Sequence, residues 1–97
     1  MKLIQTEDRP FEYVLVEGPR QVGHARLAPS GTIWGVRIIE PERRKGFGKA
    51  LMFLMHETAL SLGHPYVRVR VHKTNNAARE MFYNLGYRYT GYHGQDS

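Results

Sequence analysis

The sequence of 97 residues contains no cysteine, which excludes disulfide bonds, thiolate metal ligands and a cysteine nucleophile. No apolar run approaches the roughly 20 residues that a membrane-spanning helix needs, and the N-terminal segment lacks the apolar stretch of a signal peptide. The five histidines are not spaced as metal ligands usually are. We therefore expect a cytoplasmic protein that binds neither a metal nor a membrane.

The length predicts one domain over residues 1–97, because a typical domain has about 100–150 residues. The formal net charge of +5 indicates an anionic partner, such as nucleic acid, a phosphorylated cofactor or an acidic substrate. The basic residues gather in two groups, and the second group has no acidic residue within it. The groups are Arg37, Arg43, Arg44, Lys45 and Lys49, and then Arg68, Arg70, Lys73 and Arg79.

The hydrophobic pattern predicts a mixed α/β domain with one central sheet. Alternating, β-branched and aromatic residues favour strands at 11–17, 21–27, 32–39, 66–71 and 87–93. Apolar residues at three- and four-residue steps predict one helix over 47–62 and a second over 76–85. The order is β-β-β-α-β-α-β, and a right-handed crossover would place strands 32–39 and 66–71 parallel to each other.

Segment 43–49 (RRKGFGK) is the most informative part of the sequence, because it joins a strand to the start of a helix. A helix N-terminus presents unpaired backbone N–H groups, and glycine lets a phosphate approach them without a Cβ in the way. The glycine spacing does not match a nucleotide P-loop. The dinucleotide fingerprint needs a third glycine at position 51, which is leucine.

The pattern that does match is R-x-x-G-x-G, at Arg43, Gly46 and Gly48. It resembles the acetyl-coenzyme A (acetyl-CoA) loop of the GNAT superfamily of N-acetyltransferases. A second motif is similar to the last motif of that family and comprises Asn75, Ala78, Phe82, Gly86 and Tyr87. The resemblance covers about residues 11–90 and implies the GNAT fold and the transfer of an acetyl group from acetyl-CoA to an amine.

The resemblance also implies which residues hold acetyl-CoA. Backbone groups of Ile38 and Ile39 would bind the pantetheine arm, which would lie between the splayed strands 32–39 and 66–71. Asn75 would contact the same arm, and Ala78 and Phe82 would line its groove. The pyrophosphate would be held by the backbone N–H groups of Arg43, Arg44, Lys45, Gly46, Phe47, Gly48 and Lys49.

The catalytic residues are less well marked. Many family members have a tyrosine at the position of Phe82, where its hydroxyl can protonate the leaving thiolate, and phenylalanine cannot do so. Glu40 and His72 are the candidates for the base, although each also fits a solvated surface residue. Tyr83 is a further candidate, as is His24. A backbone N–H near Ile39 would stabilise the oxyanion.

The sequence departs from the family at both ends. The usual N-terminal strand and helix pair are predicted to be missing, and the final strand to be short or missing. We therefore expect a large acceptor, such as a protein lysine or N-terminus, or a pocket completed by a second subunit in a homodimer. A non-catalytic acyl-CoA-binding regulatory module is the alternative. Nucleic-acid binding has no support beyond charge.

Overall fold

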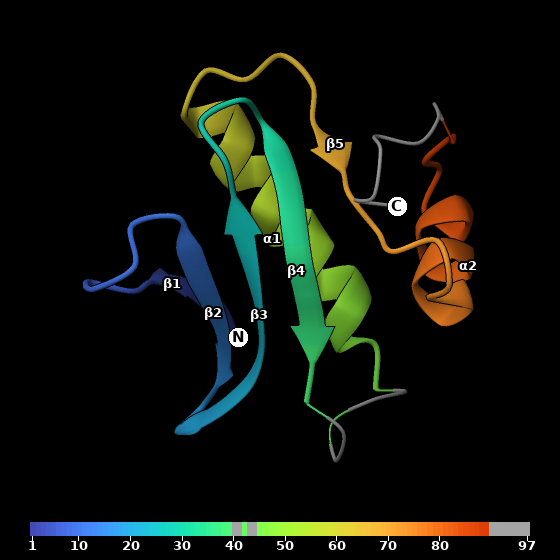
Figure 1. Ribbon diagram of the computed structural model, residues 1–97. Coiled ribbons are helices and arrows are strands. Elements are labelled where there is room, and N and C mark those ends of the chain that lie inside the picture. Colours follow the sequence, from blue (N-terminus) through green and yellow to red (C-terminus); the bar gives the residue numbers. More distant parts are fainter. Residues whose placement is uncertain (40–41, 43–44, 90–97) are drawn as a thin grey trace.

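The computed structural model describes residues 1–39, 42 and 45–89. Five strands form one sheet in sequence order, with two helices beside it (Figure 1). The elements are β1 Lys2–Gln5, β2 Glu12–Glu17, β3 Arg20–Leu27, β4 Thr32–Ile38, α1 Phe47–Ser61, β5 Arg68–Val69 and α2 Asn76–Asn84. Strands β1 to β4 pair antiparallel, and β5 pairs parallel to β4. The mixed α/β class and the parallel crossover are confirmed.

The two ends of the chain differ from the sequence prediction. Strand β1 exists and pairs with β2, so the prediction that the first strand is missing was wrong. Its pattern gave little signal, because only Leu3 of its four residues is partly buried. A turn, not a helix pair, joins β1 to β2, and Thr6 N–H donates to the Glu12 carbonyl at 3.0 Å across it. Residues 87–89 form no strand, and the rest of predicted strand 87–93 lies outside the described residues.

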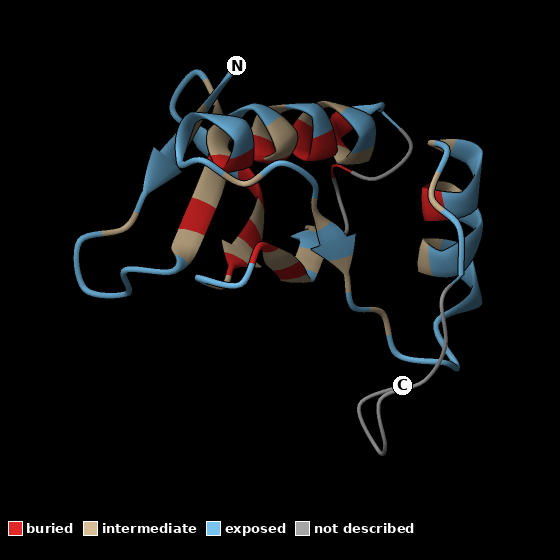
Figure 2. Cartoon of the chain, turned by 90° about the horizontal axis from the view of Figure 1, so that it is seen from above, coloured by how far each residue is buried: buried red, intermediate tan, exposed pale blue. Residues whose placement is uncertain are grey.

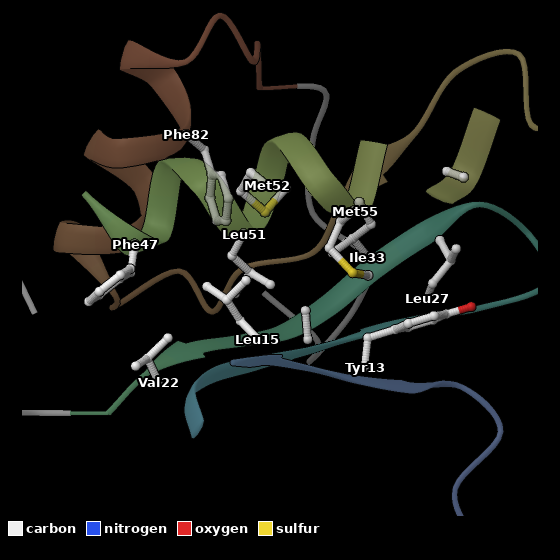
Figure 3. Packing of buried hydrophobic residues seen from close by; sticks show 12 residues of the cluster. Tyr13, Leu15, Val22, Leu27, Ile33, Phe47, Leu51, Met52, Met55 and Phe82 are labelled. Carbon is white, nitrogen blue, oxygen red and sulfur yellow. The ribbon is translucent and has the colours of Figure 1, made fainter. Parts of the chain in front are cut away.

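The core lies between α1 and one face of the sheet (Figure 3). Helix α1 buries residues at helical spacing, which explains the periodicity of the sequence. The buried side chains are Tyr13, Leu15, Val22, Ala25, Leu27 and Ile33 from the sheet, Phe47, Leu51, Met52, Met55 and Ala59 from α1, and Phe82 from α2. Both helices therefore contribute to the same core, on the same side of the sheet.

Glycines end both helices. At the end of α1, His64 N–H donates to the Ala59 carbonyl and Gly63 N–H to the Leu60 carbonyl, each at 3.0 Å, with Gly63 at φ 93°. This is a Schellman C-cap, which needs a residue in the left-handed region. Helix α2 ends in the same way at Gly86, and Tyr87 packs edge-on against Phe82. The Gly86 and Tyr87 positions of the motif over 75–87 are thus explained by the end of α2 and its packing.

Candidate functional site

Strands β4 and β5 part soon after they meet. They pair at Thr32 with Arg68 and at Ile33 with Val69, and Arg70 N–H then donates to the Ile33 carbonyl at 2.9 Å. Beyond this bond β4 continues to Ile38, while the chain after β5 turns toward α2 (Figure 1). The expected splay of the two parallel strands is confirmed, and it leaves the second half of β4 without a paired strand on that side among the described residues; we call this unpaired stretch the gap.

A β-bulge in β4 decides which backbone groups face this gap. Ala25 of β3 lies opposite both Gly35 and Val36, and Gly35 has φ 63°. Such a bulge commonly places glycine in the left-handed region, and it shifts the strand alternation by one residue. After the bulge, Ile39 N–H donates to β3 at 3.0 Å, so alternation directs the backbone groups of Ile38 toward the gap.

The N-terminus of α1 lies after β4. Its first intrahelical bond runs from Ala50 N–H to the Gly46 carbonyl at 3.2 Å, so the amides of Phe47, Gly48 and Lys49 precede the helical ladder. Among the described residues no side chain caps this end, and the first turn holds no acidic residue. Gly46 has φ 82°, and a Cβ there would meet nothing within 4 Å. The end of the helix is open to an anion.

The second glycine of the loop is explained by packing. A Cβ on Gly48 would lie 2.9 Å from Sδ of Met81 in α2. Gly48 therefore lets α2 approach the first turn of α1. The side chain of Phe47 is buried in the core, so only its backbone N–H is available to a ligand.

Glu42, which the sequence analysis missed, anchors the loop before α1. Its side chain is only 6% exposed and accepts hydrogen bonds from Arg20 of β3 and from Lys45 Nζ, the latter at 2.9 Å. The hydrogen bond from Lys45 and the charge of Arg20 lower the pKa of Glu42, although its desolvation acts in the opposite direction. The only signal in the sequence was an acidic residue within a basic, glycine-containing loop.

The structure places the other loop residues unevenly. The ammonium of Lys45 is bound to Glu42, whereas Lys49 is exposed on the first turn of α1. Glu40, Arg43 and Arg44 lie outside the described residues.

The motif residues of α2 differ in their surroundings. Asn75 caps the helix, since its Oδ1 accepts from Ala78 N–H at 3.1 Å. Ala78 is partly buried. Phe82 is only 5% exposed and packs in the core, and its place along the pantetheine groove stays a prediction.

The two described candidates for catalysis lie apart. His72 precedes α2 and is exposed, and its Nδ1 accepts from Thr74 N–H at 3.2 Å and lies 2.7 Å from Thr74 Oγ1. Tyr83 lies in the last turn of α2, is 63% exposed, and has the Arg88 guanidinium over its ring at 4.7 Å. Nine residues of helix, about 13 Å, separate these two ends of α2. The structure does not bring His72 and Tyr83 together.

His24 has a different environment. Its Nδ1 is buried without a hydrogen-bond partner among the described residues. In the sheet, His24 of β3 lies opposite Arg37 of β4.

A pocket of about 310 Å³ lies away from the gap, at the other end of β5. Among its lining residues, His56 of α1 and Tyr87 are hydrogen-bonded, with ring centres 5.5 Å apart. Burial lowers the pKa of His56 and raises the pKa of Tyr87 to about 12. Both shifts favour a neutral pair, in which the Tyr87 hydroxyl donates to Nε2 of His56. The pair satisfies its own polar groups, and its role is structural.

This pair predicts a pH dependence of stability. The pKa of His56 is lower in the folded state than the value of about 6.5 in the unfolded chain, so acid favours unfolding. The contribution is complete above pH 6.5 and decreases as the pH falls below it. We expect the melting temperature to drop by about 2–4 °C more between pH 7.5 and 5.5 in the wild type than in H56Q. An equal drop in melting temperature between these two pH values in the wild type and H56Q would contradict the assignment.

No helix in the described part of the chain is long and apolar enough to cross a bilayer. No group of three or more histidine or acidic side chains in that part of the chain could hold a metal ion.

Residues 2–87 match the model of the acetyltransferase (GNAT) family. A search of curated proteins gives no match.

Several solved structures have the same fold. AAC(6')-Iy, an aminoglycoside N-acetyltransferase solved with a bisubstrate analogue of CoA, aligns over 84% of this chain and 64% of its own at 13% identity and a TM-score of 0.74. The PaiA N-acetyltransferase of Thermoplasma acidophilum, solved with CoA, aligns over 87% of this chain and 55% of its own, at 15% identity and a TM-score of 0.73. The ribosomal-protein-S18-alanine N-acetyltransferase of Escherichia coli aligns over 82% of this chain and 54% of its own, at 17% identity and a TM-score of 0.66. The chain thus spans less than two thirds of each of these proteins.

Proposed function

The chain belongs to the acetyltransferase (GNAT) family, and we propose that it is an N-acetyltransferase that transfers an acetyl group from acetyl-CoA to a primary amine. The observation that carries this proposal is the combination of two features. The open N-terminus of α1, with Gly46 at its start, is the next element after β4, the strand whose second half borders the gap. One end of the site fits a diphosphate, and the other fits an extended arm that ends in a thioester.

The binding roles follow from these contacts. The amides of Phe47, Gly48 and Lys49 would hold the pyrophosphate, with the charge of Lys49 nearby. The pantetheine arm would lie along β4 at Ile38. We do not assign Ile39 to this arm, because its N–H donates to the Val22 carbonyl and its carbonyl accepts from Glu42 N–H. Because the Ile39 N–H already donates to Val22, we also do not assign it as a donor to the oxyanion.

The chemistry is direct acyl transfer. The neutral amine nitrogen attacks the carbonyl carbon of the thioester, the C–S bond breaks, and the amine loses a proton as the thiolate leaves. Catalysis of this kind depends mostly on positioning. Because Phe82 is buried and Tyr83 points to Arg88, we assign protonation of the thiolate to water. Nε2 of His72 stays a candidate base, since the contacts of this ring with Thr74 are made through Nδ1.

Two measurements test this proposal. Calorimetric titration with acetyl-CoA should show saturable binding, and a thiol-release assay over amines, polyamines and peptides should show turnover with at least one of them. Absence of acetyl-CoA binding at millimolar concentration would overturn the proposal. Binding without thiol release from any acceptor would favour a non-catalytic acyl-CoA-binding module.

Asn75 allows the cap of α2 to be separated from cofactor binding. N75D retains an oxygen that can accept from Ala78 N–H but loses the amide donors, whereas N75A loses both. We expect N75A to lower the free energy of unfolding by about 1 kcal/mol and N75D to leave it nearly unchanged. If the Asn75 amide also donates to the pantetheine arm, N75D should weaken acetyl-CoA binding about fivefold or more. Full affinity in N75D would limit Asn75 to capping.

A further inference from the structure

The face of the sheet opposite α1 carries no helix in the part of the chain that the structure describes (Figure 2). Residues directly opposite each other on paired strands lie on the same face. Val14 lies opposite His24, His24 opposite Arg37, and Arg26 opposite Trp34. In β5 and the residues beside it, Val67, Val69 and Val71 pack against the core, so Arg68 and Arg70 between them point to the other side. We call this surface the open face; it includes Glu12, Val14, His24, Arg26, Trp34, Arg37, Arg68 and Arg70.

The open face is strongly basic. Among the described residues, Glu12 is the acidic residue of this face; it faces Arg26 across β2 and β3, and its Oε2 lies 3.5 Å from NH2 of Arg26. Arg37 is exposed and has no acidic partner among the described residues. The guanidinium of Arg70 lies 5.8 Å from the centre of the Trp34 ring, on the same face. Positive charge therefore exceeds negative charge here.

The basic residues flank the gap. Arg70 directly follows β5, and its N–H donates to the Ile33 carbonyl of β4 at the point where the two strands part. Arg37 directly precedes Ile38, whose backbone faces the gap. The other side of the gap is covered, because Gly48 of α1 and Met81 of α2 approach each other there. An acceptor must therefore reach a thioester in the gap from the open face, across Arg37 and Arg70.

We propose that the acceptor is a peptide segment rich in aspartate and glutamate, which the open face holds while its amine enters the gap. This inference rests on the proposed acetyltransferase function and adds the class of acceptor. Nonspecific binding of single-stranded nucleic acid usually needs successive aromatic rings on which bases stack. Among the described residues, the rings in contact with arginines of the open face are Trp34, beneath Arg70, and Tyr66, beneath Arg68, so both are already stacked. The charge pattern therefore fits acidic side chains better than bases.

Trp34 provides a readout that needs no catalysis, because it is the only tryptophan of the chain. The probes are peptides of equal length with one lysine flanked either by glutamates or by glutamines. We expect the glutamate peptide to change Trp34 fluorescence in a saturable way that weakens as salt rises from about 50 to 500 mM, since salt screens exposed charges. The glutamine peptide should cause little change at the same concentrations.

R37E tests the contribution of charge beside the gap, and R88E is the matched control. Arg88 follows α2 and contacts Tyr83, and it is not part of the open face. We expect R37E to weaken binding of the glutamate peptide, and to raise its KM in acetyl transfer, by about tenfold. R88E should change both less than twofold. Acetyl-CoA affinity should stay the same in both variants.

Three results would overturn the inference. These are equal binding of the glutamate and glutamine peptides, equal effects of R37E and R88E, and tighter binding of an oligonucleotide of the same charge. If acetyl-CoA binds and thiol is released equally with all peptides, the acceptor class is wrong while the acetyltransferase function stands. If acetyl-CoA does not bind, the function itself fails, whatever the peptide titration shows.

Discussion

G46E should raise the dissociation constant for acetyl-CoA by more than about 100-fold, which corresponds to about 2.7 kcal/mol. Gly46 starts α1, and the space beside its Cα is open, so a glutamate would fit there. Its carboxylate, at the N-cap position, would compete for the amides of Gly48 and Lys49 and would repel the pyrophosphate that we place there. A negative side chain is favourable at a helix N-terminus, so the folded state should tolerate the change.

G63E separates loss of the anion site from backbone strain. Gly63 lies at the other end of the same helix, has φ 93° against 82° for Gly46, and also has nothing within 4 Å of a Cβ. A side chain in this conformation costs about 1–2 kcal/mol at either position. G63E should therefore lose stability while it keeps its acetyl-CoA affinity, as measured by calorimetry. Equal affinity in G46E and the wild type would contradict the phosphate site.

The parts of the fold that the sequence predicted are those with local causes. The face of α1 follows from helical spacing, and the ends of both helices follow from Gly63 and Gly86, whose left-handed conformation a C-cap requires. Strand β1 escaped prediction because only Leu3 contacts the core, so its burial depends on pairing with β2. The bulge at Gly35 was readable in principle, since glycine within a strand pattern often marks one.

The site was less predictable than the fold because its geometry depends on residues far apart in sequence. Phe82 matches the motif, but only the packing of α2 shows that it is buried. The resemblance to the GNAT family assigns the backbone of Ile39 to a ligand, whereas pairing with Val22 of β3 uses its N–H. Gly48 was read as space for phosphate, and the structure shows that it also makes space for Met81.

E42A should weaken acetyl-CoA binding by about tenfold or more, although it removes a negative charge near the proposed phosphate site. Two effects oppose each other. Loss of the carboxylate favours an anion by long-range electrostatics, but it also frees Lys45 and breaks the link from β3 to the residue before Gly46. Position should dominate, since the amides of α1 must meet the phosphates in one geometry.

E57A is the charge-matched control, because Glu57 is exposed on α1 and its removal changes the net charge equally. It should alter acetyl-CoA affinity less than twofold. R20A should resemble E42A, and the double variant should lose little more than either single one if the two residues act as one anchor. Additive losses would mean that Arg20 and Glu42 act independently. Tighter binding by E42A would show that charge outweighs position, and the anchoring role would then be wrong.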